Sequence, residues 1–225
     1  MPDVLAIIPA YQEGPRVGGV VLGATAHLPV LVVDDGSSDD TAARAGAAGA
    51  AVLVQRPNQG KGAALRAGFG WALERGFAAV VTLDADGQHD PAEIPRFLDA
   101  REDGGGDLII GRRDFSRMPP VRRLSNRLGG LAMSWAAGRD IPDNQSGYRL
   151  LSRRLIERVL DSREPGFEYE IEMITTCIRA GYRLDWVPIQ TIYAGAPSHI
   201  RPWRHVTSFV RMVVATRRAV RTPLP

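Results

Sequence analysis

The sequence is poor in cysteine and has no long run of apolar residues. Cys177 is the only cysteine among 225 residues, so an intramolecular disulfide and a cysteine-based zinc cluster are both excluded. No stretch approaches the roughly 18 consecutive apolar residues of a membrane-spanning helix. The first residues also lack the charged and then apolar pattern of an export signal. We therefore expect a cytoplasmic protein.

Acidic residues are missing from the C-terminal part of the chain. Six of the 28 basic residues and none of the 25 acidic residues follow Asp185, so residues 1–185 are net negative although the whole chain carries +3. The basic surplus can form a patch for anionic partners. A nucleic-acid-binding module without enzymatic activity is one alternative. The aromatic residues that such modules interleave with basic ones are lacking, however, and we expect no nucleic acid partner.

Short apolar runs alternate with segments of helical length. The runs are continuous rather than alternating, which is typical of parallel strands covered by helices on both faces. We expect one α/β domain over residues 1–225, with a mostly parallel, Rossmann-like sheet. The predicted strands are residues 4–8, 30–33, 51–54, 79–83 and 108–110, and the predicted helices are roughly 16–27, 39–49, 61–75 and 91–101.

Acidic side chains follow the ends of these predicted strands. In open α/β sheets, ligands bind at the edge where the carboxyl ends of the strands meet. Asp84 and Asp86, with one small residue between them, can hold a hard divalent ion such as Mg²⁺ or Mn²⁺ that keeps positions open for diphosphate oxygens. Asp35 can accept a hydrogen bond from a nucleoside, or it can be a turn residue that caps the following helix. For Asp39 we prefer the capping interpretation.

Three further residues near these strand ends have more than one interpretation. Lys61 lies between two glycines that let the backbone approach a phosphate, and its charge can bind that phosphate, but it also suits the start of a helix. Gln88 can belong to a metal shell or contact a phosphate. We interpret His89 as a turn residue.

The strand-end residues belong to longer motifs in a fixed order. These are Pro9-Ala10-Tyr11-Gln12-Glu13, VDDGSSDDT at 33–41, NQGKGAA at 58–64, LDADGQHDP at 83–91, Gly111-Arg112-Arg113 and Ser146-Gly147-Tyr148-Arg149. With them the sequence resembles the family 2 glycosyltransferases, within these the dolichol-phosphate mannose synthase-like branch, over about residues 4–195. The resemblance implies a GT-A fold and an inverting transfer, from an α-linked donor to a β-linked product.

The resemblance also implies which residues bind a nucleotide diphosphate sugar. Pro9, Tyr11, Glu13 and Asp35 would line the nucleoside pocket. The metal would lie among Asp84, Asp86 and Gln88, and Asp86 is also a candidate catalytic residue. The complete set of expected donor-binding residues is Pro9, Ala10, Tyr11, Glu13, Asp35, Lys61, Asp84, Ala85, Asp86 and Gln88.

The acceptor is predicted from the residues after 111. An alcohol nucleophile needs a general base, whereas a lipid phosphate is already anionic and needs cations to hold it. Residues 146–149 stand where many sugar-to-alcohol members of the family carry an acidic pair. We therefore predict transfer of a hexose from GDP-mannose or UDP-glucose to a polyprenyl phosphate. Arg113, Arg123 and Arg127 would hold that phosphate, with Ser125 as a hydrogen-bond donor and Arg113 as a catalytic candidate. Asp143 is the best base candidate if the acceptor is instead a soluble alcohol or glycan.

Amphipathic segments follow this predicted nucleotide-sugar-binding half, residues 1–111. In the acceptor-side half, residues 112–200, the segment 121–135 has apolar residues at helical spacing and a basic first half. The tail, residues 201–225, repeats that design. We expect either a peripheral contact with the cytoplasmic face of the membrane or a helix packed on the sheet. We interpret Glu168, Glu170 and Glu172 as a solvated helix face that turns Ile171 inward. The sequence predicts no oligomeric state.

Overall fold

The computed structural model describes residues 3–115, 120–161, 168–190, 192 and 202–222. Among these residues, seven strands form one sheet in the order β3-β2-β1-β4-β6-β5-β7. Strand β6 is antiparallel to β4 and β5, and all the other pairs are parallel, which confirms the prediction of a mostly parallel sheet. The strands are β1 (Val4–Ala10), β2 (Val30–Asp34), β3 (Ala51–Val54), β4 (Ala79–Thr82), β5 (Leu108–Arg113), β6 (Arg149–Ser152) and β7 (Leu184–Ile189).

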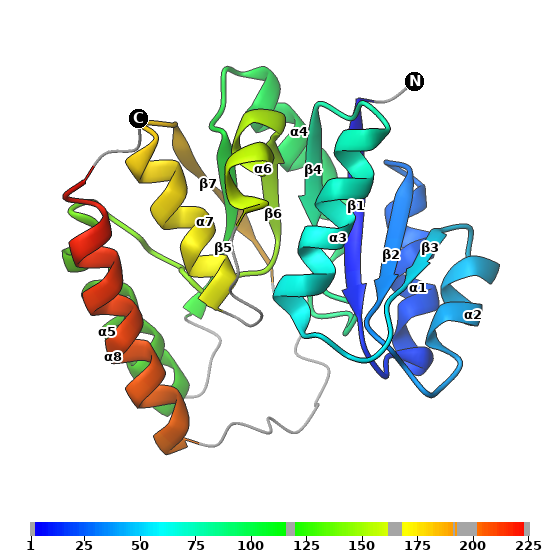
Figure 1. Cartoon of the computed structure of the whole chain (residues 1–225), viewed down its shortest axis with the longest axis horizontal. Helices are drawn as coiled ribbons and strands as arrows, with labels where there is room; N and C mark the ends of the chain where they lie inside the picture. Colours follow the sequence, from blue (N-terminus) through cyan, green and yellow to red (C-terminus); the bar gives the residue numbers. More distant parts are fainter. Residues whose placement is uncertain (1–2, 116–119, 162–167, 191, 193–201, 223–225) are drawn as a thin grey trace.

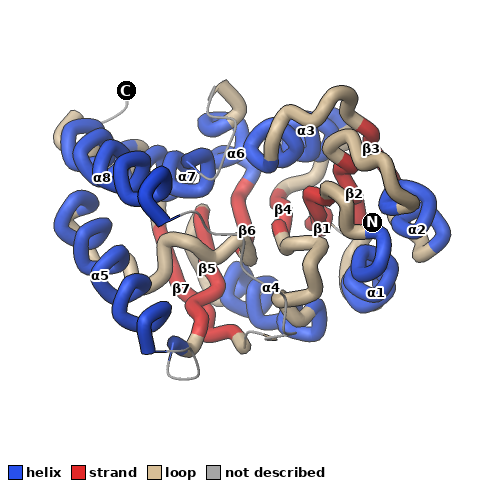
Figure 2. Tube along the Cα trace, turned by 90° about the horizontal axis from the view of Figure 1, so that it is seen from below, coloured by secondary structure: helices blue, strands red, loops and turns tan. Residues whose placement is uncertain are grey.

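Helices cover both faces of this sheet (Figures 1 and 2). Helices α1 (Gly14–Thr25) and α4 (Ile94–Glu102) lie on one face, with α2 (Thr41–Ala47) beside α1 and the 3₁₀ helix η1 (Pro91–Glu93) before α4. On the other face lie α3 (Lys61–Glu74), α6 (Arg153–Val159) and α7 (Glu168–Arg179). Helices α5 (Pro120–Ala137) and α8 (Pro202–Ala219) pack together at the β7 end of the sheet, and α8 also contacts α7.

The apolar strands separate two hydrophobic cores. From β1, Leu5 and Ile7 pack with Phe69 of α3, whereas Ala6 and Ile8 pack with Val17 of α1. Because successive side chains of a strand point to opposite faces, a strand buried on both faces must be apolar at every position. This is why the predicted strands read as continuous apolar runs. The predicted helices differ from α1 to α4 by at most three residues at their ends.

Helices α5 and α8 carry an exposed apolar stripe. Met133 is fully buried, but Leu128, Leu131 and Trp135 are 58%, 68% and 62% exposed. The inner face of α5 therefore packs against the protein core, and a membrane contact of its exposed face stays a prediction. On α8, Val210 and Val214 are exposed as well, at 55% and 41%. Within the described ranges, no helix combines the length and apolar character that crossing a bilayer requires.

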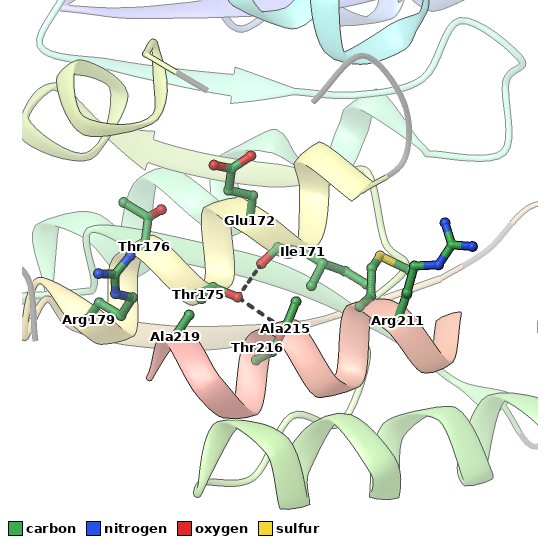
Figure 3. Close-up of a pocket in the computed structure, with 10 residues that line it drawn as sticks. Ile171, Glu172, Thr175, Thr176, Arg179, Arg211, Ala215, Thr216 and Ala219 are labelled. Carbon is green, nitrogen blue, oxygen red and sulfur yellow. Dashed lines mark hydrogen bonds between the residues drawn. The ribbon is translucent and has the colours of Figure 1, made fainter. Parts of the chain in front are cut away.

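A cavity of about 470 Å³ lies between α7 and α8 (Figure 3). The Thr175 hydroxyl, which donates to the Ile171 carbonyl over 3.0 Å, lies 3.4 Å from the hydroxyl of Thr216 across it. The lining residues include none of the donor, acceptor or metal residues predicted from the sequence. The cavity is therefore a feature of how α8 packs on α7.

Helix α3 packs against β1 so closely that a glycine is needed at the contact. A Cβ at Gly68 would lie 2.8 Å from Cγ2 of Ile7 and 3.3 Å from Cγ2 of Val33. We predict that Gly68→Ala lowers the free energy of unfolding by about 1–3 kcal/mol, the usual effect of overpacking a core. Gly70→Ala in the same helix is the matched control. It meets nothing within 4 Å and should raise stability by about 0.5–1 kcal/mol. Urea unfolding curves measure both effects, and equal stabilities would contradict the close packing.

Candidate functional site

The loops after β1, β2 and β4 meet at one edge of the sheet. The amide of Asp35 donates to the carbonyl of Ala10 over 2.9 Å, and the amide of Leu83 donates to the carbonyl of Ile7 over 3.2 Å. Of the residues predicted at this edge, Ala10 and Ala85 are buried, Pro9 and Glu13 are half-buried, and Tyr11 is exposed. The strand ends are therefore adjacent, as the strand-end motifs predict.

Asp35 fastens the loop that leads into α3. Its carboxylate accepts from the amides of Gln59 and Gly60 over 2.8 and 2.7 Å, and the side chain is buried. Gly60 has a φ of 92°, a conformation that favours glycine, and Lys61 follows as the first residue of α3. The nucleoside contact of Asp35 stays a prediction, and it would use lone pairs that these amides leave. Asp39 accepts from the amide of Thr41, the first residue of α2, over 3.1 Å, although the N-cap position itself is Asp40.

The Lys61 ammonium lies between two carboxylates. Its Nζ is 2.5 Å from Oδ1 of Asp84 and 2.8 Å from Oε1 of Glu170. Burial disfavours the charged form of Lys61, but the charges of the two carboxylates outweigh this effect and raise its pKa. Burial also works against the charged form of Asp84, yet Lys61 chiefly, with smaller contributions from His89 and Arg113, lowers the pKa of Asp84 to about 2. Both groups are charged at neutral pH.

The interpretation of Glu170 as a solvated residue is wrong. The residue is only 4% exposed, and its carboxylate faces Lys61. Ile171 is buried as expected, and the side chain of Glu168 lies outside the described residues. The three alternating glutamates suggested one polar face. The sequence around them contains no sign of the ammonium, which comes from α3, more than 100 residues earlier.

The turn after β4 is shaped by its own side chains. Both carboxylate oxygens of Asp86 accept from Gln88, one from the backbone amide over 2.9 Å and one from the side-chain amide over 2.8 Å. The Nδ1 atom of His89 accepts from the amide of Asp84 over 3.2 Å. Burial lowers the pKa of His89, so its ring is neutral at neutral pH. His89 is therefore a turn residue, as interpreted from the sequence.

The carboxylates of Asp84 and Asp86 fit a divalent ion whose remaining ligands come from a substrate and from water. In the part of the chain that the structure describes, no three His, Cys, Asp or Glu side chains gather as a complete metal site. Mg²⁺ in nucleotide sites usually takes one or two carboxylates and completes its shell with phosphate oxygens and water. Gly147 leaves space for this arrangement, since a Cβ there would lie 2.8 Å from Oδ2 of Asp84 and 2.9 Å from Nζ of Lys61.

A buried arginine that the motif pattern alone did not explain holds the segment around Gly147. Arg149 is 1% exposed and donates to the carbonyls of Ser146 over 2.7 Å, of Asn144 over 3.3 Å and of Glu170. It therefore joins the loop before β6 to the first turn of α7. The hydroxyl of Thr82 also donates to the Gly147 carbonyl over 2.8 Å, which ties this loop to β4.

Arg113 and Asp143 form an ion pair instead of standing apart. Nε of Arg113 lies 2.8 Å from Oδ2 of Asp143, and Nη2 lies 2.9 Å from Oδ1. The backbone amides of Arg113 and Gln145 also donate to this carboxylate, over 3.2 and 3.1 Å. Asp143 is 2% exposed. Of the other residues predicted to hold the acceptor, Arg123 is half-buried on α5 and Arg127 is exposed, while the side chain of Ser125 lies outside the described residues.

Comparison with known proteins agrees with this geometry. Residues 5–160 match the family described as Glycosyl transferase family 2. The chain belongs to this family. It is 37% identical over 203 residues to the polyprenol monophosphomannose synthase of Mycolicibacterium smegmatis. This alignment covers 82% of this chain and 76% of the relative. It is 35% identical over 201 residues to the undecaprenyl-phosphate mannosyltransferase of Micrococcus luteus, with 83% and 82% covered.

Solved structures of other proteins share the fold. A glucosyl-3-phosphoglycerate synthase of Mycobacterium tuberculosis, crystallised with phosphoglyceric acid, has a TM-score of 0.72 and 25% identity, over 98% of this chain and 81% of that one. The same synthase with Mn²⁺, UDP and glucosyl-3-phosphoglycerate has a TM-score of 0.67 and 22% identity, with the same shares covered. This family 2 protein is thus a glycosyltransferase with a GT-A-like fold, and the alternative of a non-enzymatic nucleic-acid-binding module is wrong.

The space at Gly147 generates a prediction for this family 2 site. Gly147→Ala would place a methyl group against the Asp84 carboxylate and the Lys61 ammonium, which are ends of side chains and can move aside. We expect a folded protein whose affinity for Mn²⁺ falls roughly tenfold or more, because the methyl group moves the Asp84 carboxylate away from the position in which it would hold the ion together with Asp86. Calorimetric titration with Mn²⁺ measures the affinity, and circular dichroism checks the fold. An unchanged Mn²⁺ affinity in a folded Gly147→Ala variant would show that the present position of the Asp84 carboxylate is not required for binding the ion.

Proposed function

We propose that this protein is an inverting, metal-dependent hexosyltransferase that uses a polyprenyl phosphate as its acceptor. The donor is a nucleotide diphosphate sugar, GDP-mannose or UDP-glucose. The names of the two relatives, both about 35% identical or more over most of the chain, favour mannose as the sugar and a polyprenyl phosphate as the acceptor. The geometry of the site supports two parts of this proposal, the metal and the phosphate acceptor.

The donor and the metal are assigned to the edge formed by the loops after β1, β2 and β4. Asp84 and Asp86 would hold Mg²⁺ or Mn²⁺ with Gln88 beside them, and the ion would stabilise the charge of the leaving nucleoside diphosphate. Pro9, Ala10, Tyr11, Glu13 and Asp35 would bind the nucleoside. Lys61, already charged and close to Asp84, would contribute a second positive charge for the diphosphate.

The burial and the hydrogen bonds of Asp143 are the observation that supports a phosphate acceptor. A general base must reach the proton that it removes. The Asp143 carboxylate is buried and accepts four hydrogen bonds, two of them from the guanidinium of Arg113. An anionic phosphate needs no such base. Arg113, Arg123, Arg127 and Ser125 would then hold the acceptor phosphate by charge and hydrogen bonds.

A polyprenyl phosphate lies in a membrane, and α5 and α8 suit a peripheral contact with it. Their exposed side chains include Leu131, Trp135 and Val210, and neither helix contains an acidic residue. The guanidinium of Arg217 lies 5.0 Å from the centre of the Trp135 ring, so cationic and aromatic groups adjoin. Amphipathic helices with arginine, tryptophan and leucine bind anionic bilayer surfaces. We propose that this pair contacts the cytoplasmic face of the membrane.

A soluble acceptor is the second candidate. It is favoured by the 25% identity to a glucosyl-3-phosphoglycerate synthase crystallised with phosphoglyceric acid. Incubation with GDP-mannose, UDP-glucose and related donors, Mn²⁺ and a polyprenyl phosphate in detergent separates the candidates. Sugar recovered in the organic phase supports the lipid acceptor. Donor turnover only with added phosphoglycerate or another soluble alcohol would overturn it.

The metal is tested by removing one of its two carboxylates. We predict that Asp86→Ala lowers turnover by about 100-fold or more, because the leaving diphosphate loses its electrostatic stabilisation. Asp40→Ala is a control that removes an acid on the exposed side of the neighbouring loop, where Asp40 pairs with Arg44. The steady-state rate of sugar transfer is measured with and without chelator. Full activity of the wild-type enzyme in excess chelator would contradict the metal requirement.

The acceptor arginines are tested together. We predict that Arg123→Gln with Arg127→Gln raises the Michaelis constant for a polyprenyl phosphate about tenfold and leaves slow hydrolysis of the donor unchanged, because only the acceptor loses charged contacts. Arg44→Gln with Arg75→Gln removes two exposed charges on the opposite half of the sheet and is the control. If the variant with Arg123→Gln and Arg127→Gln glycosylates the lipid normally, the soluble acceptor becomes the favoured candidate.

A further inference from the structure

Glu170 shares a single ammonium group with the candidate metal ligand Asp84. Lys61 Nζ lies 2.5 Å from one carboxylate and 2.8 Å from the other, so both contacts are within hydrogen-bond distance. The side chains of Lys61, Asp84 and Glu170 are only 20%, 28% and 5% exposed. Water therefore cannot easily replace either partner of the ammonium.

A divalent ion at Asp84 competes with Lys61 for the same carboxylate. If the ion binds, Lys61 must withdraw from Asp84, and it is unfavourable for a buried ammonium to lose a carboxylate partner. Glu170 removes that difficulty, because Lys61 keeps one carboxylate partner while it releases the other. Without Glu170, the ammonium would depend more strongly on its contact with Asp84.

The position of Glu170 is fixed independently of Lys61. Its carbonyl accepts a hydrogen bond from Arg149, which also holds the carbonyls of Asn144 and Ser146 beside Gly147. Gly147 in turn lies against the Asp84 carboxylate and Lys61. The first turn of α7 is thus tied to the loop next to Asp84, and the Glu170 carboxylate stands ready at the ammonium whether or not Asp84 holds it.

We propose that Glu170 is a positioning residue, which keeps Lys61 paired while Asp84 passes from the ammonium to a divalent ion. Glu170 itself does not touch the donor. This inference rests on the metal site of the proposed function, but not on the identity of the sugar or the acceptor. The first turn of α7 would then influence the affinity for the ion. This affinity would depend on a residue outside the Asp84–Asp86 turn.

The test is the affinity for Mn²⁺ alone, measured by electron paramagnetic resonance of the free ion in the absence of nucleotide. We expect Glu170→Gln to weaken Mn²⁺ binding roughly tenfold, because Lys61 loses one of its two carboxylate contacts and competes more strongly with the ion for Asp84. Lys61→Met should tighten Mn²⁺ binding, since the competing cation is gone. In the Lys61→Met background, Glu170→Gln should change the affinity less than twofold, because its effect passes through Lys61.

Two variants separate the contact from a general effect of charge. Glu170→Asp keeps the negative charge but draws it away from Lys61, so it should behave like Glu170→Gln. Glu74→Gln removes an exposed acid from the helix that carries Lys61 and should leave Mn²⁺ affinity unchanged. Thermal unfolding checks that each variant is folded.

The outcomes distinguish this inference from the proposed function. Mn²⁺ binding by Glu170→Asp at the wild-type level would overturn it in favour of a simple charge effect. The same weakening by Glu170→Gln with and without Lys61 would also overturn it. In both cases the metal site itself survives. Failure of the wild-type protein to bind Mn²⁺ would overturn both the inference and the metal requirement of the proposed function.

Discussion

The contact of one ammonium with two carboxylates joins the halves of this glycosyltransferase. Lys61 comes from the start of α3, Asp84 from the end of β4 and Glu170 from the first turn of α7. These charges are largely withdrawn from water, so each is stable only while it is paired. The requirement to keep every charge paired fixes the relative positions of the loop after β4, the loop before β6 and α7. A metal and a diphosphate would enter an arrangement of charges that is already in place.

The scaffold explains why such distant residues meet. Parallel strands bring their carboxyl ends to the same edge, so the loops after β1, β2 and β4 adjoin. The antiparallel strand β6 then enters beside β4 from the opposite direction, which brings Gly147, just before β6, to the Asp84 carboxylate at the end of β4. Arg149, the first residue of β6, holds both that loop and α7. One short antiparallel strand thus brings the loop around Gly147 and the start of α7 to the edge that carries Asp84.

The sequence predicted most of the donor half and much less of the acceptor half. The predicted strand segments in β1 to β5 are mostly apolar, and Asp35 and Asp84 follow two of them, so the fold and the meeting of these strand ends at one edge could be predicted. Strand β6 has only four residues and runs directly into α6, and no sequence pattern predicted its antiparallel pairing. The burial of Glu170 depends on a lysine distant in the sequence, and the pairing of Arg113 with Asp143 depends on a loop that folds back over 30 residues. The local periodicity of a sequence gives no information about such distant contacts.

The choice of nucleophile tests the account most directly. If Asp143 is held by Arg113 and no base is needed, the enzyme should glycosylate a polyprenyl phosphate but not the free polyprenol of the same chain length. The measurement compares transfer of labelled mannose from GDP-mannose to the two lipids in the same detergent, with the organic-phase product identified by mass spectrometry. We predict a mannosyl phosphate lipid from the first and no product from the second. Mannosylation of the free alcohol at a similar rate would contradict the account, since a general base would then have to act.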